Sequence, residues 1–104
     1  MDSGIAITAE KLVVPTVKLA CKFTVKEDDI VRLVGISSKK IALNVINKVS
    51  FWLSYENNGL LYCKLCNRGP FTKRGLYLHL SRVHTNDIKN MLEEEIRHEI
   101  RILL

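Results

Sequence analysis

The sequence predicts an α+β fold in which helices dominate and strands are short. Three observations support this prediction. Apolar residues recur at spacings of three and four in residues 39–53 and 87–103, which is the pattern of helices with one buried face. Residues 11–25 are rich in Val, Thr and Leu, and Val and Thr are favoured in strands. Two cysteines and two histidines between positions 63 and 84 have the spacing of metal ligands in a very small α+β module.

The N-terminal segment is expected to contain extended structure. Residues 1–9 show no regular pattern, so we expect them to lie outside regular elements. Residues 11–25 then form one or two short strands with an edge or bend at Pro15, which cannot donate a ladder hydrogen bond. From Val17 to Val25 apolar residues occupy every second position, the pattern typical of a half-buried strand. Cys21 falls on the apolar side of this strand and is expected to be a buried core thiol.

A pair of helices is predicted to follow. Thr24 and Glu27 form a T-x-x-E capping box, which predicts a helix over residues 26–34 that stops at Gly35. Ser37 or Ser38 can cap a second helix, over residues 39–53. The buried stripe of this second helix is expected to consist of Ile41, Ala42, Val45, Ile46, Val49, Trp52 and Leu53.

This helix pair has two interpretations. A short helix, a glycine turn and a capped amphipathic helix follow one another as in a helix-turn-helix unit, which the segment resembles. In that case the second helix would face the major groove of DNA. Its expected nucleic-acid contacts are Lys39, Lys40, Asn44 and Lys48. Alternatively, the two helices form an ordinary hairpin that packs on the strand of residues 11–25.

A metal-ligand motif occupies the second half of the chain. Cys63 and Cys66 are separated by two residues, His79 follows after twelve more, and His84 after another four. The first pair sits in one tight turn, and the second pair is spaced to lie on one helix. Four such donors complete the tetrahedral coordination of one structural Zn²⁺ and leave no position for a substrate. We therefore predict these four residues as the ligands of a single Zn²⁺.

The motif and its surroundings resemble the C2H2 zinc finger family over residues 62–84. Tyr62, Phe71 and Leu76 stand where the family has the apolar residues of its small core. The resemblance implies a ββα finger with residues 60–62 in its first strand. Phe71 follows the second cysteine by five positions where the family has four, so the turn must differ locally. The stretch GPFTKRGLYLHLSRVH is similar in style to small single-finger DNA-binding proteins of archaea and of their viruses and plasmids.

The finger has few side chains suited to reading bases. In DNA-binding members of the family three positions near the helix start touch bases. Counted back from His79, these positions fall on Thr72, Gly75 and Leu78, which are poor base readers. Basic side chains can hold phosphates instead, and Arg74 would reach a guanine if the finger were tilted. The expected nucleic-acid contacts of the finger are Lys64, Arg68, Thr72, Lys73, Arg74 and Arg82.

The C-terminal segment is predicted to be an amphipathic helix over residues 87–103, capped by Thr85 or Asn86. Its apolar stripe comprises Ile88, Leu92, Ile96, Ile100 and Leu103. The stripe has two interpretations: it folds back on the N-terminal segment, or it forms the seam of a homodimer through residues 88–103. A long coiled coil is not expected, because a spacing of four is not a strict heptad. His98 lies outside the metal motif and is expected on the surface.

The charge of the chain is unevenly distributed. The net charge is +5, yet residues 30–86 hold nine bases and a single acid, Glu56, while the remaining ten acids lie in the flanks. Such segregation favours a polyanionic partner for the central segment. No apolar run is long enough to span a membrane, and residues 1–20 lack the pattern of a signal peptide. We therefore expect an intracellular protein, in the cytoplasm or nucleoid, or in the nucleus of a eukaryote.

Together these features predict three segments: an N-terminal strand-and-helix module (residues 1–56, helix-turn-helix-like), a C2H2 finger (60–84) and a C-terminal helix (85–104). The expected function is zinc-dependent binding of double-stranded DNA by a small transcriptional regulator, with RNA as a further ligand left open. The alternative is a structural zinc-finger adaptor that binds another protein. Neither an enzyme nor a small-molecule substrate is expected, because no catalytic constellation is found.

Overall fold

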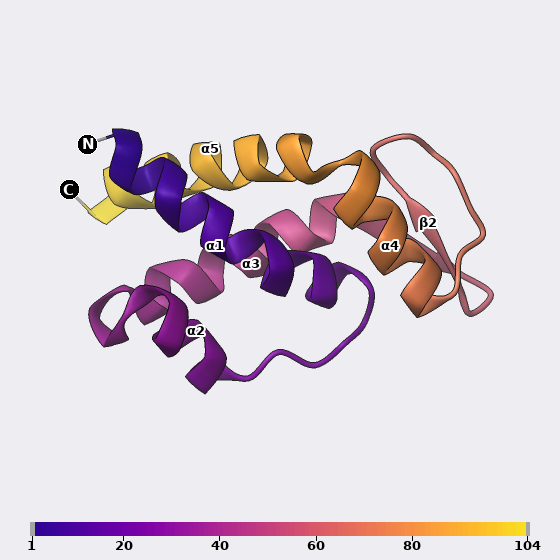
Figure 1. Cartoon of the computed structure of the whole chain (residues 1–104), viewed down its shortest axis with the longest axis horizontal. Coiled ribbons are helices and arrows are strands. Elements are labelled where there is room, and N and C mark those ends of the chain that lie inside the picture. Colours follow the sequence, from indigo (N-terminus) through magenta and orange to yellow (C-terminus); the bar gives the residue numbers. More distant parts are fainter. Residues whose placement is uncertain (1, 104) are drawn as a thin grey trace.

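The structure, a computed structural model, describes the backbone of residues 2–103 and the side chains of residues 4–102. The described part contains five α-helices, one 3₁₀ turn and one antiparallel hairpin, which confirms the α+β class (Figure 1). The helices are α1 (Asp2–Ala20), α2 (Glu27–Val34), η1 (Ile36–Ser38), α3 (Lys39–Leu53), α4 (Lys73–Val83) and α5 (Thr85–Leu103), and the strands are β1 (Ser54–Asn57) and β2 (Leu60–Cys63).

Three helices form the body of the molecule. α1, α3 and α5 pack against one another in all three pairs, and α2 covers α1 and α3 from the side. Both chain ends lie at one end of the elongated molecule, whereas α4 and β2 lie at the other (Figure 1). The metal-ligand motif is thus held at the tip opposite the termini.

The prediction for residues 1–25 was wrong, because α1 is a single helix from Asp2 to Ala20 that includes Pro15. Met1 lies outside the described residues. The residues buried between α3 and α5 are spaced by three and four along α1, so tertiary packing outweighs the strand propensity of Val and Thr. The buried hydroxyl of Thr16 donates a hydrogen bond of 2.7 Å to the Leu12 carbonyl, which satisfies this polar group inside the helix. Cys21 directly follows α1 and is fully buried, as predicted.

The helix pair has the predicted boundaries except at the start of its first helix. α2 begins at Glu27 with Lys26 in the N-cap position, so Thr24 lies too far back to cap the helix and the capping box does not form. Gly35 ends α2 with φ +88°, as predicted from the sequence. α3 spans residues 39–53 as predicted, but Trp52 is 44% exposed and does not belong to the buried stripe.

One hydrophobic core runs through the whole molecule. The cluster of buried residues in the helical body continues into the end of the molecule that carries the metal-ligand motif, where it includes Leu61, Cys63, Leu76 and Leu80. The largest fully buried side chains include Leu12, Ile30, Ile46, Leu53, Leu76, Leu80, Ile88 and Leu92. The module at the tip is therefore packed onto the helices rather than connected to them by a linker alone.

The apolar stripe of α5 folds back on the body. Ile88 and Leu92 are fully buried and Ile96 is 5% exposed, so these residues are already covered within one chain. The side chain of Leu103 lies outside the described residues. A homodimer through residues 88–103 stays a prediction, and at this end of α5 Ile100 of the stripe and the nearby Ile102 are exposed enough to contribute. His98 is exposed, as predicted.

Candidate metal centre and its basic surroundings

The first two candidate ligands lie in a turn that follows a β-hairpin. β1 and β2 pair antiparallel around Asn58 and Gly59, both with positive φ, as a tight two-residue hairpin turn requires. β2 ends at Cys63, whose N–H donates to the Arg68 carbonyl at 2.9 Å, while the Asn67 N–H donates to the Cys63 carbonyl at 2.8 Å. These hydrogen bonds fold residues 63–68 into a compact turn that brings Cys66 next to Cys63.

The unusual position of Phe71 is explained by the segment that returns from this turn. The Phe71 N–H donates to the Leu61 carbonyl at 2.7 Å, and the Leu61 N–H donates to the Phe71 carbonyl at 3.2 Å. The segment around Phe71 therefore pairs with β2 through a single bridge and forms no strand of its own. Gly69 lies so close to Tyr62 that an added Cβ would be 2.5 Å from the ring. The Tyr62 ring stacks on Tyr55 and is half-buried, so Tyr62 does not join the core as predicted.

The second pair of candidate ligands is placed by α4. Thr72 caps this helix, because its hydroxyl accepts a hydrogen bond of 3.0 Å from the Gly75 N–H. Leu76 and Leu80 anchor one face of α4 in the core. His79 lies between them and stacks on Phe71, with ring centroids 4.9 Å apart, and His84 follows directly after the helix as its C-cap residue.

These elements bring the four predicted ligands together. The donor atoms of Cys63, Cys66, His79 and His84 all lie within 4.8 Å of one another. Metal bonds of about 2.0–2.3 Å would place tetrahedral donors roughly 3.3–3.8 Å apart, and the Cys66 Sγ lies 3.2 Å from the His79 Nε2. The cluster is thus compact enough to hold one metal ion.

His84 provides an independent sign of a missing bonding partner. Its Nε2 is buried and has no hydrogen-bond partner among the described residues. Its Nδ1 lies 3.2 Å from the Asp87 Oδ2, so Nδ1–H can donate to that carboxylate and leave Nε2 as the lone-pair donor. Buried polar atoms are rarely left without a partner, and a metal ion would satisfy this one. The donor set therefore fits a bound ion.

The surroundings shift the pKa values of the four candidate ligands in different directions. The adjacent His84 lowers the pKa of the Cys66 thiol and thereby favours the thiolate, whereas burial raises the pKa of Cys63. Burial also lowers the pKa of His79, which favours the neutral imidazole. Burial acts in the same direction on His84, but the neighbouring Cys66 thiolate and Asp87 carboxylate together outweigh it and raise the pKa of His84. Thiolate and neutral imidazole are the forms that bind a metal.

Comparisons with protein-family models, with curated proteins and with solved structures gave no match. Among the described residues, no helix is long and apolar enough to cross a membrane. The geometry and the chemistry of the side chains are therefore the basis for a functional proposal.

The basic side chains of the metal-binding end are unneutralised. Within residues 4–102, none of its five bases forms an ion pair with a carboxylate. The Lys64 Nζ donates to the Phe51 carbonyl at 3.0 Å and lies over the Phe51 ring, and the Lys73 Nζ donates to the Lys22 carbonyl at 3.3 Å. Five bases on this small surface are exposed: Lys64, Arg68, Lys73, Arg74 and Arg82.

Two of the bases of α3, in contrast, form ion pairs with acids. Lys39 pairs with Glu27 at 2.7 Å, and Lys48 pairs with the buried Glu95 and Glu99 at 3.2 and 2.8 Å. These two predicted nucleic-acid contacts are thus held by acids from the flanking segments, whereas Lys40 and Asn44 are exposed. α3 itself packs between α1, α2 and α5, where the hairpin interpretation expected a strand.

The three positions that were predicted to read bases are hindered by their surroundings. The Thr72 hydroxyl is occupied as the cap of α4, and Gly75 has no side chain. Leu78 lines a cavity together with Lys18 and Phe23, which belong to the end of α1 and the loop after it. The helix face that would enter a major groove is therefore partly covered by the helical body.

Sequence reasoning missed two groups near the site. Asp87, the partner of His84, follows it by three positions at the start of a helix, and this spacing was a usable signal. Lys18, Lys22 and Phe23 were assigned to a strand, so their position beside α4 had no signal in the local pattern.

Proposed function

We propose that this chain is a zinc-dependent DNA-binding protein that acts as a small transcriptional regulator. The observation that carries the proposal is the unneutralised basic surface around the metal-ligand cluster. The acids of the flanks pair with bases of the helical body, as Glu27 does with Lys39, and leave the five bases of the finger available for phosphates. The order of β2, the Leu61–Phe71 bridge and α4 along residues 60–84 supports the proposal that this segment is a C2H2-type finger.

Zinc is the metal that suits the cluster best. Two sulfur and two imidazole donors in a compact group favour Zn²⁺ over the oxygen-preferring Mg²⁺ and Ca²⁺. Four side-chain donors complete a tetrahedron, which supports a structural rather than a catalytic ion. Binding, and not catalysis, is therefore the proposed activity.

The proposal is tested by fluorescence anisotropy of a labelled random duplex titrated with zinc-loaded protein. With at most five phosphate contacts, log affinity should fall with log salt at a slope of about −4.5, or roughly 500-fold between about 50 and 200 mM salt. Absence of binding at the lower salt concentration, with zinc bound and the protein folded, would sink the proposal.

A matched pair of variants locates the binding surface. Arg74→Glu reverses one charge on α4 and should weaken duplex binding by about tenfold or more with a shallower salt slope. Arg101→Glu makes the same change near the end of α5, at the opposite end of the molecule (Figure 1), and should leave most of the binding intact. Equal losses in both variants would show that net charge, and no particular surface, governs the interaction.

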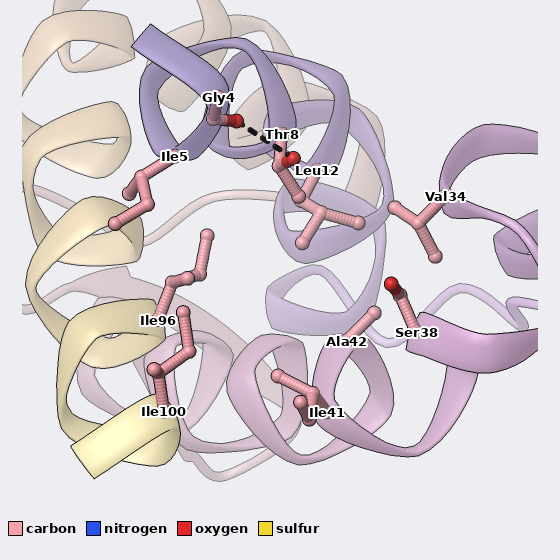
Figure 2. Close-up of a pocket in the computed structure, with 10 residues that line it drawn as sticks. All are labelled: Gly4, Ile5, Thr8, Leu12, Val34, Ser38, Ile41, Ala42, Ile96 and Ile100. Carbon is pink, nitrogen blue, oxygen red and sulfur yellow. Dashed lines mark hydrogen bonds between the residues drawn. The ribbon is translucent and has the colours of Figure 1, made fainter. Parts of the chain in front are cut away.

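The adaptor function is the second candidate, and the hindered reading positions favour it. A further observation is an apolar groove of about 480 Å³ between the start of α1 and the ends of the helices around it. Figure 2 shows Ile5, Ile41, Ile96 and Ile100 around this groove, with Thr8 bonded to the Gly4 carbonyl at its edge. Exposed Ile36 and Ile102 add apolar surface. Salt-insensitive binding to a protein, without binding to DNA, would support the adaptor.

A further inference from the structure

The junction between α1 and α4 forms a second, chemically distinct surface. A cavity of about 340 Å³ lies there, lined by Lys18, Phe23, Arg74, Tyr77 and Leu78. Its volume falls within the range of small-ligand sites, roughly 300–1,000 Å³. Two cations and two aromatic rings line this one cavity, and no local pattern predicted residues 18 and 23 beside residues 74–78.

The backbone at the end of α1 holds the aromatic side of this cavity in place. The Phe23 N–H donates to the Lys18 carbonyl at 2.9 Å and the Lys22 N–H donates to the Leu19 carbonyl at 3.1 Å, which is a Schellman motif. Lys22 takes the left-handed conformation that this motif needs, with φ +69°. Phe23 is thereby directed onto α4, where its ring meets Tyr77 edge to face at 6.3 Å.

The ring geometry suits a planar ligand. The planes of Phe23 and Tyr77 are 79° apart, so a flat ring stacked on one of them meets the other edge to face. Phe23 is 38% exposed although its ring is apolar, which leaves part of the ring available for a ligand. Leu78 adds an apolar contact beside the rings.

The surrounding charge suits an anion attached to that ring. Lys18 and Arg74 line the cavity, and the Lys73 Nζ lies 5.8 Å from the Phe23 ring centroid and within hydrogen-bond distance of the Lys22 carbonyl. Among the described residues, no acid lines this cavity, and Asp29 and Glu56 line other hollows. A planar ring joined to phosphates is the chemistry of a nucleotide.

We propose that this cavity binds an unpaired base of a nucleic-acid strand, with the base stacked on Phe23, the Tyr77 ring edge to face against it, and the adjacent phosphates held by Lys18 and Arg74. This inference rests on the proposed nucleic-acid binding and specifies the form of the ligand. Bases inside a duplex have their faces covered by their neighbours, so stacking on a side chain requires a single-stranded or extruded base. This mode of binding is also compatible with the partly covered face of α4. A finger that reads a groove contacts the edges of bases, whereas this cavity would contact the face of a base.

The test compares three labelled probes of about 12 nucleotides: an oligothymidine strand, a strand of the same length with abasic sites, and a duplex. The zinc-loaded full chain should bind oligothymidine roughly 5- to 150-fold more tightly than the abasic strand, the gain expected from one stacked base. Phe23→Leu keeps an apolar side chain and should remove this preference. Lys18→Glu should weaken binding of both single strands alike.

The outcomes separate this inference from the proposed function. Equal affinity for the abasic strand and oligothymidine, together with salt-sensitive duplex binding, would overturn the cavity and leave DNA binding intact. Binding to none of the three probes would overturn both. If Phe23→Leu does not fold, photo-crosslinking of the unmodified protein to a strand with halogenated uracil decides the matter. The crosslink is expected in the tryptic peptides 23–26 or 75–82, and crosslinks confined to other peptides would contradict the proposal.

Discussion

The four donor residues depend on a fifth residue for their arrangement. Asp87 contacts the Nδ1 of His84 and leaves the buried Nε2 for the ion, so a single carboxylate sets both the tautomer and the orientation of the ring. Asp87 is itself exposed, and its contact with His84 spans one turn at the start of α5. The metal site is therefore built across the junction of α4 and α5.

Replacement of this carboxylate tests its role. We expect Asp87→Ala to weaken zinc binding by about 10- to 100-fold, because the second ring nitrogen of His84 loses its acceptor. Competition with a chromophoric chelator measures the change. Asp28→Ala is the matched control, since Asp28 is also an acid in the first turn of a helix. An equal loss in the two variants would show that the loss of a negative charge, and not the contact with His84, lowers the affinity for zinc.

At this scale the sequence was a good guide wherever chemistry depends on spacing. Cys63, Cys66, His79 and His84 were predicted from their intervals alone, and the structure brings them together. Thr24 was wrong as a cap, because a cap depends on the residue at which the helix begins, and Glu27 begins it one residue later than expected. A one-residue shift matters little for a buried face but removes a hydrogen bond.

Among the helices, α1 shows how packing overrides local preference. It is rich in β-branched residues, which favour strands, yet its packing against α3 and α5 makes it a helix. α4, in contrast, is defined locally, with Thr72 capping its start and Leu76 and Leu80 buried along one face. Thr72 was predicted to contact nucleic acid, and the structure gives it a role within its own helix.

The cap of α4 can be tested apart from nucleic-acid binding. Thr72→Ala should lower the free energy of unfolding by about 0.5–2 kcal/mol, because the Gly75 N–H loses its acceptor. Thr72→Ser keeps the hydroxyl and should retain most of the stability. Urea denaturation of the zinc-loaded protein measures both variants. A stable Thr72→Ala protein with impaired DNA binding would instead favour direct contact with the ligand.

The ion-pair cluster between α3 and α5 gives a pH-dependent contribution to stability. Hydrogen bonds to Glu99 and Glu95 raise the pKa of Lys48 above its ordinary value. The stabilisation is therefore complete below the unfolded pKa of about 10.4 and is lost as the pH rises through the higher folded pKa. Lys48→Met should be less stable than the native chain near neutral pH, and the difference should shrink at strongly alkaline pH. Denaturant titrations across this range measure it, and a constant difference would contradict the linkage.

For the molecule as a whole, the shared core decides how it responds to loss of metal. Residues beside the metal-ligand motif, such as Leu61 and Leu80, lie in the same cluster as α1, α3 and α5, yet these three helices hold none of the four candidate ligands. We expect chelation to disorder the finger and to leave most of the helical circular dichroism, because the three packed helices keep their own contacts.

Thiol reactivity distinguishes this outcome from global unfolding. In the zinc-loaded protein all three cysteines should react slowly with a thiol reagent. After chelation Cys63 and Cys66 should react quickly, whereas Cys21 should stay slow, because it is fully buried and its pKa is raised to about 12 by burial. Mass spectrometry of the labelled peptides measures each site. Equal rates at all three cysteines would show that the helical body unfolds together with the finger.

The sequence by itself determined the helical class of residues 39–53 and 87–103 and the four residues of the metal-ligand cluster. Each of these depends on a local period or a fixed spacing of donors, which a single segment contains. Tertiary structure decided the helical state of α1, the burial of the α5 stripe and the meeting of Phe23 with Tyr77. These features depend on which surfaces meet between segments that lie far apart in the chain, and a residue's local pattern carries no information about its distant partner.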